Sequence, residues 1–242
     1  MSRVAIVTGG GYGIGRATCR LLAEAGWIVV TIDRDEVRGR ATERLIRESG
    51  GTCTFLKADV GDAVQIQRAV DWTVATYERI HGLVNNAAVR HVGNILQITE
   101  EQWDETMRVV LKGPFLCARA VISHMIAAGG GAIVNVSSPD AFGRRNMVAY
   151  AAAKGAVNTL TLCLAADHLE HRIRVNAVLP GFTLTGMTEH YSLERIAEIG
   201  ARTVAGRPGR PEDVARLICF LLSDEAETIT GGIFGGLPLA TR

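Results

Sequence analysis

Residues 4–15 have the sequence Val4-Ala-Ile-Val-Thr8-Gly-Gly-Gly-Tyr-Gly-Ile-Gly15. A continuous apolar run such as Val4–Val7 is typical of a strand that is covered on both faces. A glycine-rich turn follows this run, and a helical pattern over Arg16–Ala25 follows the turn. Glycines let a backbone approach a pyrophosphate closely, and the first turn of a helix offers free N–H groups and a positive dipole end. This order predicts a dinucleotide site; a tight turn without a ligand is the alternative.

A second apolar run, Trp27–Ile32, predicts another buried strand and is followed by Asp33. Asp33 lies eighteen residues beyond Gly15, close to the spacing at which a carboxylate reaches the ribose hydroxyls of a bound adenosine. Such a carboxylate accepts hydrogen bonds from both hydroxyls and repels a 2′-phosphate, whereas the adjacent Arg34 would attract one. We give the carboxylate more weight, which favours NAD over NADP. Helix capping by Asp33 is the alternative.

Strands and helices alternate along the rest of the chain. The predicted helices cover Asp35–Ser49, Asp62–Arg79, Glu100–Ala128, a stretch from about Tyr150 to Glu170, Leu193–Ala201 and a segment that begins at Pro211. The predicted strands cover Thr52–Lys57, Gly82–Val84, Ala132–Val136, Ile173–Leu179 and Ile229–Phe234. This alternation implies a parallel sheet with right-handed crossovers, whose ligands bind beyond the carboxyl ends of the strands. Asp59 and Asn86 fall at such ends.

The composition favours one domain over residues 1–242. Apolar residues make up 48% of the chain, which is enough for a sizeable core, and a net charge of +1 creates no broad field for nucleic acid or an anionic membrane. The N-terminus lacks a signal-peptide layout, and no uninterrupted apolar run is long enough to span a bilayer. The five cysteines are scattered without a CxxC pair. We therefore expect a cytoplasmic protein with free thiols and no nucleic-acid or membrane partner.

Pro114 interrupts the longest predicted helix, Glu100–Ala128, which begins after a capping-type residue, Thr99. Proline lacks the N–H that would bond the carbonyl of Val110. We therefore expect a kink at Pro114 and a free carbonyl at Val110. A packing kink without a chemical purpose is the alternative.

Tyr150 and Lys154 are four residues apart, so on a helix their side chains leave the same face one turn apart. A phenol has a free pKa of about 10 and is a poor acid at neutral pH. A neighbouring ammonium favours the phenolate and lowers that pKa. The pair is suited to proton transfer in alcohol and ketone chemistry, although a tyrosine and a lysine at this spacing are often ordinary helix-surface residues.

Several motifs occur in a fixed order along the chain. They are Thr8-Gly-x-x-x-Gly-Ile-Gly15, Asp59-Val60, Asn85-Asn-Ala-Ala88, Ser138, Tyr150-x-x-x-Lys154, Arg174-Val-Asn-Ala-Val-x-Pro-Gly181 and Gly209-x-Pro-Glu-Asp-Val-Ala215. Together they resemble the short-chain dehydrogenase/reductase family in its single-domain form, over nearly the whole chain. The resemblance implies an α/β fold with a Rossmann-type doubly wound parallel sheet of about seven strands and helices on both faces. It also implies a homotetramer, or a homodimer, assembled through the helices near 100–128 and 150–170.

The resemblance also implies roles for individual residues. Tyr150 is expected to act as acid/base, Lys154 as the partner that lowers its pKa and holds a ribose, and Ser138 as the group that hydrogen-bonds the substrate oxygen. Together with the glycine turn and Asp33, it predicts cofactor contacts at Gly9, Gly11, Tyr12, Gly13, Ile14, Gly15, Asp33, Asp59, Val60, Asn86, Tyr150, Lys154, Pro180, Gly181, Thr183 and Thr185.

The activity expected from this resemblance is the NAD(P)-dependent interconversion of a small secondary alcohol and a ketone by hydride transfer. NAD is preferred in this interpretation, and NADP remains an alternative. A nucleotide-binding regulator of the same fold that has lost catalysis is a second hypothesis. Val110 supports it, because the family often has a catalytic asparagine at this place.

Two other departures from the family pattern concern loops. The segment between Ser138 and Tyr150 is one residue shorter than usual, so Ser137 competes with Ser138 for the catalytic position, and strand register favours Ser138. Gly235-Gly-Leu-Pro-Leu239 replaces the family's Val-Asp-Gly-Gly, which affects the C-terminal subunit contacts and the pocket floor.

The substrate pocket is expected to draw on residues 90–94, residues 139–147 and a lid at about 182–205. Arg90, His91, Arg144 and Arg145 indicate a polar or anionic substrate, with solvated loop charges as the alternative. No pattern of metal ligands accompanies His91, so no metal is expected. The sequence does not identify the substrate further.

Overall fold

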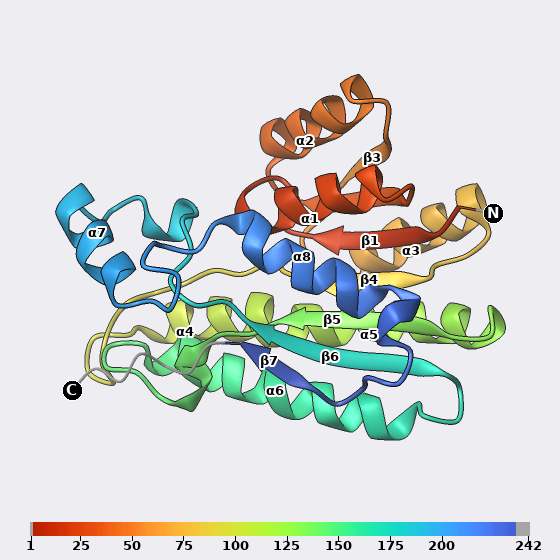
Figure 1. Ribbon diagram of the computed structural model, residues 1–242. Coiled ribbons are helices and arrows are strands. Elements are labelled where there is room, and N and C mark those ends of the chain that lie inside the picture. Colours follow the sequence, from red (N-terminus) through yellow and green to blue (C-terminus); the bar gives the residue numbers. More distant parts are fainter. Residues whose placement is uncertain (1, 236–242) are drawn as a thin grey trace.

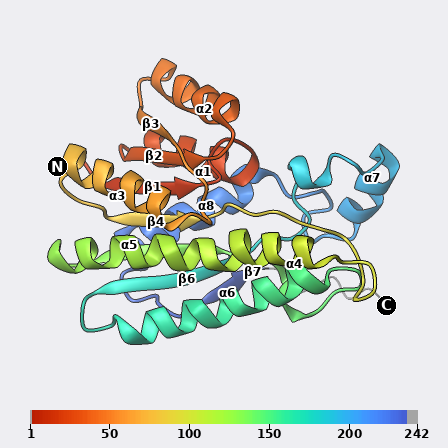
Figure 2. The ribbon, with the colours of Figure 1, turned by 180° about the vertical axis from the view of Figure 1, so that it is seen from behind.

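The structure is a computed structural model that describes residues 2–235. Figures 1 and 2 show its strands and helices from opposite sides. The strands are β1 (Val4–Thr8), β2 (Ile28–Asp33), β3 (Thr52–Lys57), β4 (Gly82–Asn85), β5 (Gly131–Val136), β6 (Ile173–Leu179) and β7 (Ile233–Gly235). The α-helices are α1 (Gly13–Glu24), α2 (Glu36–Glu48), α3 (Ala63–Tyr77), α4 (Glu100–Thr106), α5 (Gly113–Ala127), α6 (Val148–Asp167), α7 (Leu193–Ala201) and α8 (Pro211–Leu222). Shorter helical segments are η1 (Met107–Lys112), η2 (Pro139–Phe142), η3 (Gly186–Thr188) and η4 (Asp224–Ala226).

The seven strands form one parallel sheet in the order β3-β2-β1-β4-β5-β6-β7. β1 pairs with β2 on one side and with β4 on the other, so the strand order reverses direction between β1 and β4. Ligands of such sheets bind beyond the carboxyl ends of the strands at this switch point. The structure confirms the predicted doubly wound sheet and its number of strands.

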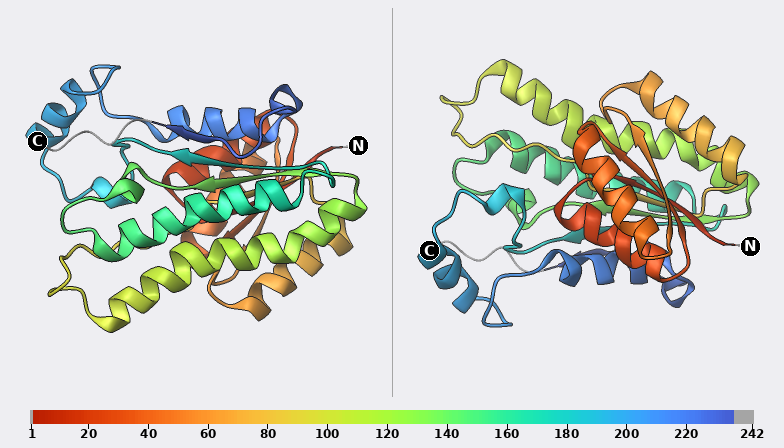
Figure 3. Two further views of the ribbon diagram at one scale, coloured as in Figure 1. Left: turned by 90° about the horizontal axis from the view of Figure 1, so that it is seen from below. Right: turned by 90° about the horizontal axis from the view of Figure 1, so that it is seen from above.

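Alternating side chains of each strand enter two separate cores. In β1, Val4 and Ile6 pack with residues of α3 and α5, whereas Ala5 and Val7 pack with residues of α1 and α8. Figure 3 shows α8 on one side of the sheet and α5 and α6 on the other. Since successive side chains of a strand point to opposite faces, an apolar run without alternation is what a sheet covered on both faces requires.

β7 is shorter than the sequence suggested and comprises Ile233–Gly235 rather than Ile229–Phe234. Gly231 has a φ of +70°, which interrupts regular strand geometry. Residues 229 and 230 bind β6 through side chains instead: the Asn176 side chain donates to the Ile229 carbonyl at 2.9 Å, and the Thr230 hydroxyl oxygen accepts from the Val175 N–H at 3.0 Å. The predicted C-terminal departure, Gly235–Leu239, lies almost entirely outside the described residues.

The long helical region contains a π-helical segment, η1, directly before Pro114. The N–H of Gly113 bonds the carbonyl of Arg108, five residues earlier. Pro114 then stands in the first turn of α5, where a missing N–H is tolerated. The interruption predicted at Pro114 therefore takes the form of a π-helical segment, a feature that is frequent at functional sites. The free carbonyl at Val110 stays a prediction.

Two helical stretches, Glu100–Ala127 and Val148–Asp167, have the length and mean hydropathy of a membrane-crossing helix. No uninterrupted apolar run in the sequence is long enough to span a bilayer, but these two helices reach that length when polar residues are averaged in. In the fold, 56% and 44% of their most apolar windows are buried inside the protein. Core helices commonly have this composition, because one side packs on a sheet. Phe115, Ile126 and Leu162 remain exposed on these helices by 45%, 38% and 46%.

Arg174 in β6 joins the sheet to the end of α8. Its guanidinium donates to the carbonyls of Leu221 at 2.7 Å, Ser223 at 3.0 Å and Ile229 at 3.3 Å. Burial lowers the pKa of Arg174, although the nearby Asp224 raises it. A planar five-donor fork suits several carbonyls at once, and a lysine ammonium does not reproduce its geometry.

We expect Arg174→Lys to lower the free energy of unfolding by about 2–3 kcal/mol, because buried carbonyls lose charge-assisted hydrogen bonds. Urea unfolding measures this loss. The matched control is Arg172→Lys, an exposed position nearby, which should change stability by less than about 0.5 kcal/mol. Equal stability of the two variants would contradict the assigned role.

Candidate functional site

A cavity of about 790 Å³ lies at the carboxyl ends of the strands. Its walls include residues at or just after the ends of six strands: Gly9, Asp33, Ala58, Asn86, Ser137 and Pro180. Most of the predicted site residues line it: Gly9, Tyr12, Gly13, Ile14, Asp33, Asp59, Val60, Asn86, Ser138, Tyr150, Lys154, Pro180, Gly181, Thr183 and Thr185. Gly11 and Gly15 do not line it.

The glycine turn leaves no space for side chains. A Cβ added to Gly15 would lie 2.1 Å from the Gly9 carbonyl oxygen, and one added to Gly9 would lie 2.8 Å from the Cα of Ala87. Gly9 and Gly13 also have φ values of +64° and +54°, which favour glycine. Helix α1 begins at Gly13, earlier than predicted, and no side chain caps its first turn. Its first N–H groups therefore face the cavity end of the turn without a side-chain partner.

Asn86 fastens this turn to the end of β4. Its amide nitrogen donates to the carbonyls of Thr8 at 3.1 Å and Gly9 at 3.0 Å. The Thr8 hydroxyl oxygen in turn accepts from the N–H groups of Asn86 and Ala87. Both donors of the Asn86 amide are therefore used within the protein, which gives this residue a role in shaping the turn.

The Asp33 carboxylate is fixed at the end of β2. One oxygen accepts from the Gly11 N–H and the other from the Asp35 N–H, each at 2.9 Å. Asp35, rather than Asp33, caps α2, since its side chain accepts from the Arg38 N–H at 3.0 Å. The alternative that Asp33 serves as the helix cap is therefore wrong. Gly11 acts through Asp33 and has no place in the cavity wall.

Two cationic side chains stand near Asp33. Arg38 lies 5.1 Å from the centroid of the Tyr12 ring and forms an ion pair with Asp35 at 3.3 Å. Arg34 forms an ion pair with Glu105 of α4 at 3.5 Å. Sequence reasoning missed Arg38 as a wall residue, although its position one turn into the helix after Asp33 is the signal that was available.

Asp59 also has partners within the protein. Its carboxylate accepts from the Gly61 N–H and from Arg108 of η1, each at 2.8 Å. Burial raises the pKa of Asp59, but these hydrogen bonds and the charge of Arg108 outweigh it and hold the pKa below its usual value. The carboxylate is therefore ionised and oriented at the cavity wall.

The two serines after β5 differ in their contacts. Ser137 is buried, and its hydroxyl donates to the main-chain carbonyl of Lys154 at 3.3 Å. The Ser138 hydroxyl oxygen accepts from the Asp140 N–H at 3.1 Å. Ser138 also interacts with the Tyr150 hydroxyl and lowers the pKa of Tyr150. Of the two, Ser138 is the one that acts on the tyrosine.

Tyr150 and Lys154 are both buried on α6 and line the cavity. Burial and, less strongly, the charge of Asp140 raise the pKa of Tyr150 to about 12, against the lowering effects of Arg90 and Ser138. Burial lowers the pKa of Lys154 to about 7. The Lys154 ammonium donates to the Val136 carbonyl and lies 5.6 Å from the centroid of the Tyr150 ring.

The expected lowering of the Tyr150 pKa by Lys154 is not part of these shifts and stays a prediction. The lysine is not among the groups that shift it, and the phenol becomes a weaker acid. The physical reason is desolvation, which disfavours the charged form of both groups. Both side chains are enclosed by protein, and the lysine is directed at a backbone carbonyl.

An apolar wall stands beside Tyr150. Val110 is buried and packs with Tyr150 and Ala153, and Val89 and Leu111 surround this cluster. Val109, the preceding residue of η1, lines the cavity itself, which sequence reasoning missed. The sequence pattern did not predict this position of Val109, because apart from Pro114 nothing in the sequence marks a π-helical segment.

The segment after β6 covers one side of the cavity and is tied to two other walls. The Tyr12 hydroxyl donates to the Glu189 carboxylate at 2.8 Å, and Arg90 donates to the Met187 carbonyl at 2.5 Å. The Thr183 hydroxyl donates to the Gly181 carbonyl at 3.0 Å. The hydrogen bond to Glu189 raises the pKa of Tyr12.

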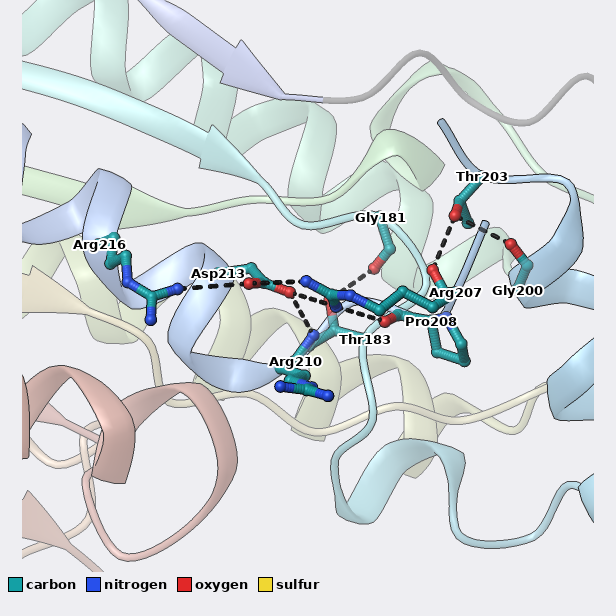
Figure 4. A network of polar contacts seen from close by, with 9 residues as sticks. All are labelled: Gly181, Thr183, Gly200, Thr203, Arg207, Pro208, Arg210, Asp213 and Arg216. Carbon is teal, nitrogen blue, oxygen red and sulfur yellow. Dashed lines mark hydrogen bonds and ion pairs between the residues drawn. The ribbon is translucent and has the colours of Figure 1, made fainter. Parts of the chain in front are cut away.

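A second network anchors the end of this segment to α8 (Figure 4). Arg207 donates to both oxygens of Asp213, at 2.7 and 3.2 Å, and the Asp213 carboxylate also accepts from the Arg210 N–H at 2.8 Å. The Arg207 hydrogen bonds, followed by the Arg210 N–H, lower the pKa of Asp213 to about 2. The Thr203 hydroxyl donates to the Arg207 carbonyl at 2.7 Å, so hydrogen bonds hold residues 200–210 in place beside α8.

The residues suggested for substrate contact separate into two groups. Arg90 and Arg144 line the cavity, whereas His91 and Arg145 do not. The His91 ring nitrogen lies 2.8 Å from Glu105. Within residues 2–235 no group of three or more histidine, cysteine, aspartate or glutamate side chains is arranged to hold a metal ion.

Nearly the whole chain is similar to several known proteins. A family model described as enoyl-(acyl carrier protein) reductase matches residues 9–235. Cis-4-hydroxycyclohexanecarboxylate dehydrogenase of Sinomonas cyclohexanicum is 39% identical and covers 96% of this chain and 93% of its own length. Cyclopentanol dehydrogenase of a Comamonas species is 37% identical, covering 95% and 93%. The crystal structure of levodione reductase superposes with a TM-score of 0.92 at 29% identity, covering 96% of this chain and 95% of that one.

The buried lysine predicts a dependence of stability on pH. In the unfolded chain a lysine titrates near 10.5, whereas burial lowers the pKa of Lys154 to about 7. Between these values the unfolded state binds more protons, so this group adds stability as the pH rises. We expect Lys154→Met to be more stable than the wild type at about pH 6, and this advantage to shrink toward about pH 9.5. Urea unfolding at several pH values measures it.

The matched control is Lys112→Met, since Lys112 is exposed. The difference between this variant and the wild type should not vary with pH over the same range. A pH-independent difference for Lys154→Met as well would show that the lysine keeps its ordinary pKa in the folded protein.

Proposed function

This chain belongs to the short-chain dehydrogenase/reductase family, and we propose that it interconverts a secondary alcohol and a ketone with NAD as the preferred cofactor. Its named relatives are dehydrogenases and reductases, so the chain is an enzyme, an oxidoreductase that uses a nicotinamide cofactor on a small alcohol or ketone. The observation that carries the proposal is one cavity that contains the glycine turn, Asp33 and the Ser138, Tyr150 and Lys154 side chains.

The residues present fit a nicotinamide dinucleotide. A side chain at Gly9 or Gly15 would fill the turn, which leaves the backbone free to approach a pyrophosphate. The uncapped first turn of α1 provides N–H donors and a positive dipole end for its charge. When bound, the nicotinamide ring supplies the carbon that accepts or gives up the hydride.

Asp33 supports NAD rather than NADP. Its carboxylate has both oxygens oriented by backbone N–H groups at the end of β2, where an adenosine ribose lies in folds of this type. A fixed negative charge there repels a 2′-phosphate. Arg34 is drawn toward Glu105, which neutralises part of its attraction for a phosphate.

Tyr150 is proposed as the general acid and base. In alcohol oxidation its phenolate oxygen takes the proton of the substrate hydroxyl, while a hydride leaves the carbon that carries this hydroxyl. In ketone reduction the phenol returns that proton to the substrate oxygen. Ser138 steadies the substrate oxygen by donating a hydrogen bond, and Lys154 holds a ribose and adds positive charge near the phenolate. Because burial alone favours the neutral phenol, the positive charges near Tyr150 have to offset desolvation during oxidation.

Val110 stands where the family often has an asparagine. A hydrophobic residue at this position places an apolar contact against Tyr150. The relatives are enzymes, so the substitution does not favour a regulator that has lost catalysis. The main-chain carbonyl of Val110, rather than a side-chain amide, is the group that would hold a water next to Lys154.

We make three further proposals, on a lid over the cavity, on the oligomeric state and on the cellular location. We propose a single domain in which residues 182–205 act as a lid, which slower proteolysis of this segment on adding NAD would test.

We propose a homotetramer or homodimer formed by α4, α5 and α6, whose shallow groove includes Met107, Leu111, Phe115 and Leu160. Light scattering of the purified protein tests this, and a monomer contradicts it. A cytoplasmic location is part of the same proposal.

We expect Tyr150→Phe to reduce turnover of a secondary alcohol by at least about 100-fold, because the general acid–base group is lost. NAD binding, measured by calorimetry, should change by less than about threefold, since the ring is kept. The control is Tyr77→Phe, whose hydroxyl pairs with Thr54 and is absent from the cavity wall within the described residues. Wild-type turnover in Tyr150→Phe would overturn the assignment.

We expect Asp33→Asn to reduce the preference for NAD over NADP, as the ratio of kcat/KM values, by about 10-fold or more, because the charge that repels a 2′-phosphate is removed. The exposed Asp71→Asn on α3 serves as the control and should keep the wild-type ratio. An unchanged ratio in Asp33→Asn would mean that other groups select the cofactor.

A further inference from the structure

We propose that the substrate carries an anionic group, of the carboxylate kind, which Arg90 and Arg202 bind at the end of the cavity beyond Tyr150. This inference rests on the proposed function and specifies its substrate. It follows from the positions of two guanidinium groups, their partners and the charges of the other cavity residues.

Arg90 stands close to the reacting end of the site. It lines the cavity after β4, and its charge lowers the pKa of Tyr150, so its guanidinium acts on the phenol. Its hydrogen bond goes to the Met187 carbonyl, which is an uncharged partner. Within residues 2–235 no carboxylate forms an ion pair with Arg90. Its positive charge is therefore available to a ligand.

Helix α7 presents two further arginines to the same cavity. Arg195, Ile199 and Arg202 line it, and their spacing of four and three residues places them on one side of the helix. Figure 1 shows α7 beyond the carboxyl ends of the strands. The cavity-facing side of α7 therefore has a guanidinium at each end.

The two arginines of α7 differ in their partners. Arg195 forms an ion pair with Glu198 on its own helix. In the described part of the chain, Arg202 has neither an ion pair nor a side-chain hydrogen bond. Arg202 and Arg90 are thus the two cavity arginines without a carboxylate partner, whereas Arg144 has Asp140 at 3.2 Å.

The acidic residues of the cavity do not balance these charges. Among described residues the acidic side chains in its wall are Asp33, Asp35, Asp59 and Asp140. The first three belong to the ends of β2 and β3, on the adenosine side, and Asp140 is already paired with Arg144. The substrate side therefore has an excess of positive charge, which an anionic substrate complements.

The test measures binding rather than turnover. In the complex with NADH, calorimetry compares a series of carboxylates from acetate to benzoate and cyclohexanecarboxylate with the amides of the same acids. We expect at least one carboxylate to bind about 10-fold or more tightly than its amide, because a charge-assisted contact is stronger than a neutral one. Added salt should weaken the binding of the carboxylate and leave the affinity for the amide unchanged.

Arg202→Gln removes a side chain without described partners and should reduce the carboxylate preference to about threefold or less. Arg90→Gln should do the same, and Arg90→Lys should keep part of the preference because it keeps the charge. The control is Arg145→Gln, a neighbouring exposed arginine outside the cavity wall, which should keep the wild-type preference.

If no carboxylate exceeds its amide, the inference is wrong. It is also wrong if Arg90→Gln and Arg202→Gln weaken amides and carboxylates equally, since the arginines would then act only on the shape of the cavity. A carboxylate preference without oxidation of any secondary alcohol, for example cis-4-hydroxycyclohexanecarboxylate, would instead refute the proposed function and leave the anion site standing.

Discussion

The close packing of the turn after β1 against the end of β4 determines the rest of the site. Gly9 approaches Ala87 so closely that a Cβ would lie 2.8 Å from its Cα, and Gly15 leaves no room beside the Gly9 carbonyl. The Asn86 amide and the Thr8 hydroxyl bind the two segments together. Because β1 and β4 flank the switch point of the sheet, this contact fixes the proposed adenosine side, reached from β1 and β2, relative to the proposed catalytic side, reached from β4 and β5.

Electrostatics divide the cavity in the same way. Carboxylates held by backbone N–H groups stand on the proposed adenosine side, with Asp33 as the example. Arginines predominate on the other side, and the buried Tyr150 and Lys154 lie between them. Burial favours the uncharged form of both groups. Ligand charges therefore have an unusually large influence on the protonation of this pair, because water screens them weakly in a buried site.

Much of the fold follows from local patterns in the sequence. Apolar runs such as Val4–Val7, alternating with helices, specify a parallel sheet, and the glycine motif specifies the turn at its centre. Features that depend on tertiary contacts were not predictable. Lys154 turns to the Val136 carbonyl because both are buried together. The last strand begins only at Ile233, because Ile229 and Thr230 bind β6 through side-chain hydrogen bonds instead. The arginines of α7 could be placed on one helix side from spacing, but not on the side that faces the cavity.

The segment around η3 contacts both halves of the cavity, through Tyr12 and Glu189 on one side and through Arg90 and Met187 on the other. A movement of this segment as a unit would break both hydrogen bonds at once. We therefore expect cofactor and product to share one exit, so that the dissociation of each depends on the same opening event.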